Sequence, residues 1–159
     1  MRKLFSFPDP VNETAARIVA GGVVVLATAY LFTLWLPLLL ILVYGFLARV
    51  LTGPSLSPLG QLATKVVAPH LPAKYCPGPP KRFAQAIGLA FSASGLILTL
   101  VGYEQASMAV LSMLVIAASL EAFLGLCLGC KIFALLMKIG LVPQEVCERC
   151  QNIWNTDHA

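Results

Sequence analysis

Charged side chains are scarce in this sequence of 159 residues, where they make up 11% of the total while 58% is hydrophobic. The mean hydropathy is correspondingly high, at +0.84. A soluble domain of this size carries about a quarter charged residues. The shortage of charge therefore excludes an ordinary soluble fold and favours a single membrane domain spanning 1–159.

Two further absences exclude other classes of protein. The net charge is only +4, and the basic residues are not clustered with aromatic residues, so a nucleic-acid partner is not expected. The opening "MRKLFSFPDPVNETAAR" places charges and prolines before any long apolar run, and no small-x-small cleavage site follows. A cleavable signal peptide is therefore not expected either.

Long uncharged runs take the place of charge, and the first of them lies between Arg17 and Arg49. As one straight helix it would extend roughly 46 Å, against a hydrocarbon core of about 30 Å. A hairpin fits better, because Pro37 is tolerated in the first turn of a second helix. We expect helices over 13–32 and 36–51, with the two arginines reaching outward from the helix ends.

Two more apolar runs predict helices over 83–102 and 106–127, which gives a four-helix membrane bundle made of two hairpins. The connection over 52–82 is rich in proline and glycine, and its later part is expected to be extended or turning. A short amphipathic segment over 130–140 is too short to span and is expected to lie at the bilayer interface. The predicted fold class is all-α.

Neither expected hairpin tip, near 33–35 or 103–105, carries a lysine or an arginine. All 11 basic residues therefore fall on one side of the predicted bundle. The positive-inside rule places that side, and both termini, in the cytoplasm.

Small residues recur at three- and four-residue steps in the third and fourth expected helices, where they predict close helix packing. They are Ala84, Gly88, Ser92 and Gly95 in the third helix, and Ala118, Ala122, Gly125 and Gly129 in the fourth. Hydrogen bonds between helices are expected from Gln85, Ser92, Ser94 and Ser112.

Glu121 is an acidic residue within an otherwise apolar span, six residues before Cys127. An ionised carboxylate there is costly unless it is paired, protonated or near water. It is either a proton-transferring group or a structural one bonded to Ser119, Gln85 or a backbone group.

Five cysteines occur, and four of them form two Cys-x-x-Cys pairs, Cys127/Cys130 and Cys147/Cys150. In a reducing cytosol such pairs usually indicate redox chemistry or metal binding. The spacing between the pairs suits a four-thiolate zinc site, which would pin the C-terminal segment to the bundle of a non-catalytic membrane subunit. Cys76, beside a proline, is expected to be incidental.

The alternative is a redox relay, in which one thiol of a pair attacks and the other resolves the mixed disulfide. Cys127 and Cys130 are expected at the C-terminal end of the fourth helix, where the helix dipole raises the pKa of a thiol and opposes its activation. Cys147 and Cys150 lie in a polar tail that a soluble partner can reach. His70 and His158 are expected to be a loop residue and a tail residue without a role.

The segments "KRFAQAIGLAFS" and "FLGLCLGCKIF" resemble a bacterial integral-membrane family, DUF4395, whose name stands for a domain of unknown function. The resemblance covers most of the chain, including the opening "DPVNETAAR". Members of this family are sometimes joined to thioredoxin-like or rhodanese-like domains, or encoded beside them, which implies thiol or sulfur chemistry in the bacterial inner membrane. Some members end soon after the first cysteine pair, which counts against a four-cysteine zinc site as a family feature.

The favoured hypothesis is a multi-pass membrane protein that exchanges disulfides or carries sulfane sulfur at the cytoplasmic face. Cys127 and Cys130 would be the core pair, Cys147 and Cys150 the shuttle pair, and Glu121 the proton carrier. No cofactor is expected, with zinc as the alternative. The expected partners are the lipid bilayer, a soluble thioredoxin-like or rhodanese-like protein, and further membrane subunits or copies of the chain.

Overall fold

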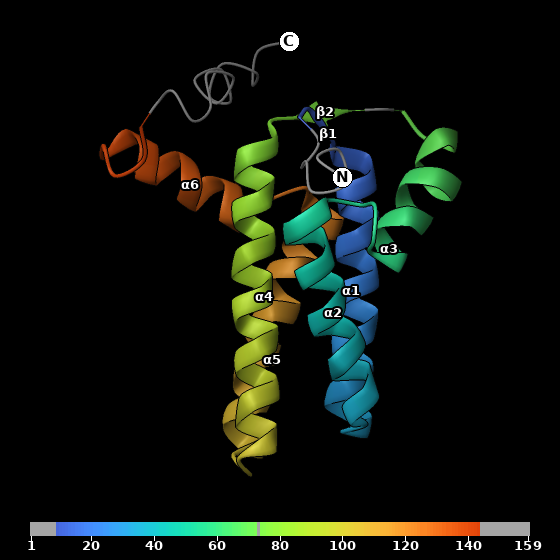
Figure 1. The fold of residues 1–159 in the computed structure, drawn as a ribbon, viewed down its shortest axis with the longest axis vertical. Coiled ribbons are helices and arrows are strands. Elements are labelled where there is room, and N and C mark those ends of the chain that lie inside the picture. Colours follow the sequence, from blue (N-terminus) through green and yellow to red (C-terminus); the bar gives the residue numbers. More distant parts are fainter. Residues whose placement is uncertain (1–8, 73, 144–159) are drawn as a thin grey trace.

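The computed structural model describes residues 9–72 and 74–143, and the predicted all-α fold class is confirmed for this part of the chain (Figure 1). The long helices are α1 (Glu13–Thr33), α2 (Leu36–Thr52), α4 (Gly78–Leu100) and α5 (Glu104–Leu124). Between α2 and α4 lie α3 (Pro58–Gln61), a π-helix (Leu62–Val67) and a 3₁₀ turn (Ala68–His70). The strands β1 (Val11–Asn12) and β2 (Tyr75–Cys76) form one antiparallel pair, and α6 (Leu128–Lys138) follows α5.

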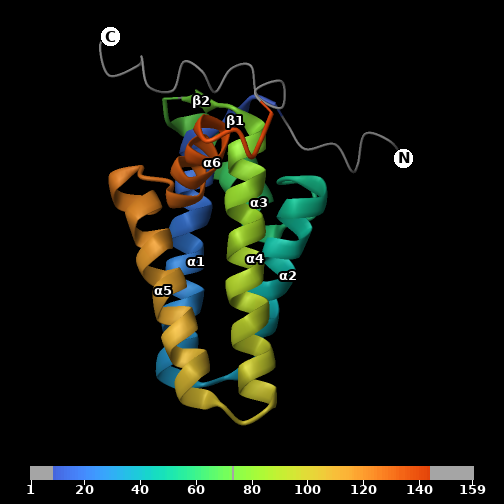
Figure 2. The same ribbon diagram turned by 90° about the vertical axis from the view of Figure 1, so that its left-hand side faces the viewer.

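The four long helices form a bundle in which α1 packs on α5 and α2 packs on α4, while α4 and α5 also contact each other (Figure 2). The turns α1–α2 and α4–α5 lie together at one end of the bundle, and β1, β2 and α6 lie at the other. The apolar core runs between the helices and includes Val23, Ala27, Tyr30, Leu39, Leu42, Phe46, Leu111, Leu114 and Ala118. The predicted pair of hairpins is thus observed.

The first hairpin turns where the sequence predicted the break. The chain leaves α1 at Leu34, which adopts the left-handed conformation with φ 52°, and Pro37 lies in the first turn of α2. Proline is tolerated there because the first N–H groups of a helix have no intrahelical acceptor. Helices α1 and α2 match the predicted ranges to within one residue.

The second hairpin begins earlier than predicted. Helix α4 starts at Gly78 rather than at residue 83, because Pro79 and Pro80 fall in its first turn, where proline is well suited. The prediction that the chain stays extended or turning up to Pro80 was therefore wrong for residues 78–80, which are helical. Helix α5 ends at Leu124 rather than at residue 127, because Gly125 takes the left-handed conformation with φ 69° and caps it.

The expected small-residue packing is confirmed for α4, where Gly88, Ser92 and Gly95 are buried. A Cβ atom on Gly88 would collide with the ring of Phe46 of α2. Gly125 and Gly129 were predicted to belong to the fourth helix, and this was wrong. Gly125 caps α5, and Gly129 lies in α6.

The polar contacts within the bundle only partly follow the prediction. Gln85 accepts a hydrogen bond from Arg49 of α2, as expected of an interhelical group. Ser92 and Ser112 instead donate to carbonyls of their own helices, Leu89 and Met108. A hydroxyl that donates to a carbonyl of its own helix needs no hydrogen-bond acceptor on a neighbouring helix.

The two arginines that border the first uncharged run both make contacts within the fold, where Arg17 is half-buried and Arg49 is buried. Arg17 donates to the carbonyl oxygens of Ala122 and Phe123, and so satisfies acceptors at the C-terminus of α5. Arg49 is 5% exposed and does not reach outward as predicted.

Helices α1, α4 and α5 are long and apolar enough to cross a membrane, and α2 is a shorter apolar helix of 17 residues. Large apolar side chains cover their outer surfaces, with Phe32 at 86% and Phe123 at 74% exposure. Water would penalise such a surface, whereas lipid does not. These features indicate a membrane protein.

Candidate thiol site

The link between α5 and α6 places the first cysteine pair at the beginning of a helix. Cys127 is the N-cap of α6, and its sulfur accepts a hydrogen bond from the backbone N–H of Cys130 at 3.3 Å. The prediction that this pair stands at a helix C-terminus was wrong, because Gly125 ends α5 three residues after Ala122 and a new helix begins at Leu128. The positive end of the α6 dipole therefore faces Cys127 and favours its thiolate.

The two thiols of the pair interact directly. The Cys130 S–H donates to Cys127 Sγ, with the sulfurs 2.7 Å apart, and both cysteines are free. A disulfide has an S–S length of about 2.05 Å, so closing this one requires the sulfurs to approach by roughly 0.7 Å. The two thiols are thus close to each other without being joined.

The hydrogen bond divides the two thiols into unlike groups. It lowers the pKa of Cys127 from the ordinary value of 9.0, because the bond from Cys130 stabilises the thiolate. It raises the pKa of Cys130, because ionising that thiol destroys the bond that it donates. Cys127 is thus the thiol of the pair that ionises more readily, and Cys130 is the one that keeps its proton.

Glu121 forms an ion pair with Lys81, with Oε1 and Nζ 2.6 Å apart. The two side chains are only 15% and 5% exposed, so each satisfies the charge of the other. The sequence predicted a bond from Glu121 to Ser119, Gln85 or backbone, and did not predict Lys81 as a member of this site. The lysine also acts on both thiols electrostatically, and its positive charge favours the Cys127 thiolate.

Lys81 had a detectable signal in the sequence. Reading "GPPKRFAQ" as a helix start, with prolines in the first turn, moves the beginning of the helix to Gly78. Lys81, Gln85 and Gly88 then follow one another at four- and three-residue steps on one face of α4.

A cavity of about 220 Å³ adjoins the thiol pair, and we call it the thiol cavity. Its walls come from α1, α2, α4, α5 and α6, and among them are Phe46, Gln85, Gly88, Ala118, Glu121 and Cys127. Cys127 and Glu121 therefore both line the same mostly apolar space.

Cys76 is close enough to Cys127 and Lys81 to interact with them electrostatically, but it differs from the pair. Its thiol donates to the carbonyl oxygen of Val11 at 3.6 Å. Burial raises the pKa of Cys76 to about 11, because the thiolate loses solvation. It is expected to be unreactive at neutral pH.

The second cysteine pair, Cys147 and Cys150, lies outside the described residues, as does His158. The zinc site and the two-pair relay therefore stay predictions. Over residues 9–72 and 74–143, no group of three or more His, Cys, Asp and Glu side chains is placed to hold a metal ion. His70 is an exposed residue of the connection.

The family model described as "Domain of unknown function (DUF4395)" matches residues 11–138, which include the whole bundle, Cys127 and Cys130. No curated protein and no solved structure matches the chain.

Proposed function

The chain belongs to the DUF4395 family, whose description names no activity, and we propose from the thiol site that it catalyses thiol–disulfide exchange at a membrane surface. One observation carries the proposal: Cys127 caps α6 while accepting the S–H bond of Cys130 at 2.7 Å. A helix N-terminus, a thiol donor and a nearby lysine all favour the same thiolate. Transfer of sulfane sulfur through Cys127 stays a prediction.

In the proposed reaction, the Cys127 thiolate attacks one sulfur of a substrate disulfide. A bond forms between Cys127 and that sulfur, the substrate S–S bond breaks, and the other sulfur leaves as a thiolate. The Cys130 thiol then passes its proton to the leaving thiolate and attacks Cys127 Sγ. This step forms the Cys127–Cys130 disulfide, breaks the bond between Cys127 and the substrate sulfur, and releases that sulfur as a thiolate, which takes up a proton from water.

The substrate is reduced by two electrons in this sequence and the cysteine pair is oxidised. A soluble dithiol protein of thioredoxin-like chemistry would return the pair to the dithiol state by the same exchange in reverse. In this scheme Lys81 stabilises the Cys127 thiolate and Glu121 holds Lys81 in place. A proton-carrying role for Glu121 stays a prediction.

The test uses full-length protein with Cys76, Cys147 and Cys150 changed to Ser, so that only the pair reacts. With an aromatic disulfide that releases a coloured thiol, this protein should release both halves of the reagent and retain none. Cys130→Ser and Cys130→Ala should each release one half and retain the other as a mixed disulfide on Cys127. A mixed disulfide that also persists when Cys130 is present would contradict the resolving role.

The pH dependence of the same reaction tests the hydrogen bond. Because the pKa of Cys127 is lowered, its thiolate forms on raising the pH through a value below 9.0. The rate should therefore rise with pH and level off below 9.0. In Cys130→Ala the midpoint should move to higher pH because the donor is lost, whereas Cys130→Ser keeps a hydroxyl donor and should shift less. Equal midpoints in all three proteins would argue against activation by Cys130.

The bundle is proposed to cross the bacterial inner membrane several times, with the thiol site on the cytoplasmic side. Support comes from the basic residues. Lys65, Lys81 and Arg82 belong to the end of the bundle opposite the two hairpin turns, and those turns carry no lysine or arginine. Both termini would then be cytoplasmic.

Cysteine labelling in intact cells measures this orientation, in a background where the five native cysteines are Ser. Tyr103→Cys, at the exposed α4–α5 turn, should react with a membrane-impermeant maleimide added outside. His70→Cys, exposed in the connection at the other end, should react only after the cells are broken. The reverse pattern would invert the orientation and place the pair in an oxidising compartment.

A further inference from the structure

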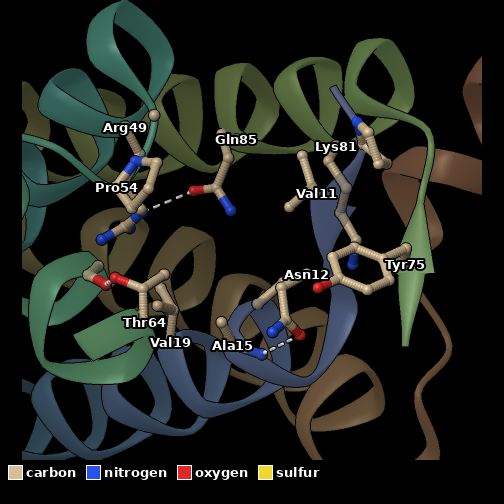
Figure 3. Close-up of a pocket in the computed structure, with 14 residues that line it drawn as sticks. Val11, Asn12, Ala15, Val19, Arg49, Pro54, Thr64, Tyr75, Lys81 and Gln85 are labelled. Carbon is tan, nitrogen blue, oxygen red and sulfur yellow. Dashed lines mark hydrogen bonds between the residues drawn. The ribbon is translucent and has the colours of Figure 1, made fainter. Parts of the chain in front are cut away.

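A second cavity, of about 260 Å³, lies between α1, the segment after α2 and the beginning of α4 (Figure 3). Its lining is mostly apolar, and we call it the basic cavity after the two cations among its polar lining residues, which are Asn12, Arg49, Thr64, Tyr75, Lys81 and Gln85. It shares Val19 and Gln85 with the thiol cavity. Thiol exchange at Cys127 assigns no role to this space.

Arg49 brings a charge into the basic cavity that no described side chain neutralises. It is 5% exposed, and its partners are the amide of Gln85, the hydroxyl of Ser57 and the ring of Phe46. All three are neutral. Glu121 acts on Arg49 from a distance, but the only salt bridge among the described residues joins Glu121 to Lys81.

Among the charged side chains that line the basic cavity or pair with its lining, the charges therefore do not balance. Arg49 and Lys81 supply two positive charges to its wall, and Glu121 compensates one of them. Buried charges in proteins are normally paired, since an uncompensated ion in a low dielectric is costly. An anion in the cavity would complete the pairing.

The hydrogen-bond donors point to the same conclusion. Arg49 uses Nε at 2.8 Å from Gln85 and Nη1 at 3.1 Å from Ser57, which leaves Nη2 without an acceptor among the described residues. Because Gln85 Oε1 receives the Arg49 bond, its other amide atom is the nitrogen, a donor that likewise has no described acceptor. Figure 3 shows the Gln85 amide directed into the cavity, with Arg49 beside it.

We infer that the basic cavity is a binding site for a small oxyanion, held by Arg49 Nη2 and Gln85 Nε2 in a space whose wall also includes Lys81. A planar guanidinium with a free edge suits the paired oxygens of a carboxylate or a tetrahedral oxyanion. None of the polar groups of this site is a cysteine, so binding of the anion does not require the thiols, although Lys81 is common to both sites.

The test is binding of radiolabelled sulfate to purified full-length protein in detergent, measured by equilibrium dialysis. Gln85→Glu is the decisive variant, because it places a carboxylate beside Arg49 with almost no change in shape. It should weaken sulfate binding by at least about tenfold, since a like charge opposes the ligand. The thermal stability of this variant should be equal or higher, because the buried arginine gains a counterion, and this separates loss of binding from loss of fold.

Gln105→Glu is the matched control, since it adds the same charge at an exposed position at the beginning of α5. It should bind sulfate as the unchanged protein does. Acetate should compete with labelled sulfate, and chloride should compete much less, because it cannot bridge the two donors. Undiminished binding by Gln85→Glu, equal competition by chloride, or no saturable sulfate binding by the unchanged protein would each overturn the inference.

Binding should also persist when all five cysteines are replaced by Ser. If that protein binds sulfate but exchanges no disulfide, the two activities are separate. Loss of sulfate binding in a cysteine-free protein that still folds would overturn the independence of the site.

Discussion

Replacing Lys81 by methionine should lower the free energy of unfolding by about 3–5 kcal/mol, because it leaves the carboxylate of Glu121 buried without its partner. The ion pair is 2.6 Å long and both side chains are largely shielded from solvent. Methionine fills a similar volume, so the lost charge rather than a cavity accounts for the effect. Unfolding in mixed micelles of increasing SDS content provides the measurement.

The control for this prediction is Lys65→Met. Lys65 is exposed and its Nζ lies 3.4 Å from Gln61 Oε1, so its loss should change the free energy of unfolding by no more than about 0.5 kcal/mol. The double variant Lys81→Met/Glu121→Leu should recover most of the lost stability, since neither charge is then buried alone. If Lys81→Met were as mild as Lys65→Met, the ion pair would be of little importance for the fold.

Gly129→Ala should displace α6 from α4 and slow the reaction of Cys127. A Cβ atom on Gly129 would lie 2.5 Å from Ala84 Cβ and 2.6 Å from Ala84 Cα, and the latter belongs to the backbone of a helix that cannot yield. Overpacking of this kind costs about 1–3 kcal/mol. Because Gly129 lies between Cys127 and Cys130, the shift should also weaken the cap and the contact between the sulfurs.

Gly21→Ala is the matched control, since Gly21 lies within α1 and nothing is within 4 Å of the position of its Cβ. Alanine there should be neutral or stabilise the helix by up to about 1 kcal/mol. The stability of both proteins and the rate at which the aromatic disulfide modifies Cys127 are the two measurements. A Gly129→Ala protein that matches Gly21→Ala in both would show that the close approach of α6 to α4 is dispensable.

The long helices were predictable because their signal is local. Uncharged runs of membrane length mark α1, α4 and α5, and Pro37 marks the start of α2. The helix ends were less predictable: two prolines counted as breakers instead begin α4, and a glycine hidden in an apolar run ends α5. Those ends depend on single capping residues rather than on hydropathy.

The candidate site was predictable in its cysteines and not in its electrostatics. The spacing of Cys127 and Cys130 is visible in the sequence, but their reactivity depends on which end of which helix they occupy. The sequence placed them at a C-terminus, which opposes a thiolate, whereas the structure places them at the N-terminus of α6, which favours one. A three-residue change in a helix boundary thus reverses the chemistry expected of the pair.

By itself the sequence determined that this chain is a helical membrane protein whose two hairpin turns carry no lysine or arginine, because hydropathy and charge are properties of each segment alone. Only the tertiary structure decided that Lys81 neutralises Glu121, that Cys130 donates to Cys127, and that Arg49 is buried beside Gln85. Most of these contacts join residues from different helices. Their geometry follows from how closely the helices pack, which glycines such as Gly88 and Gly129 permit.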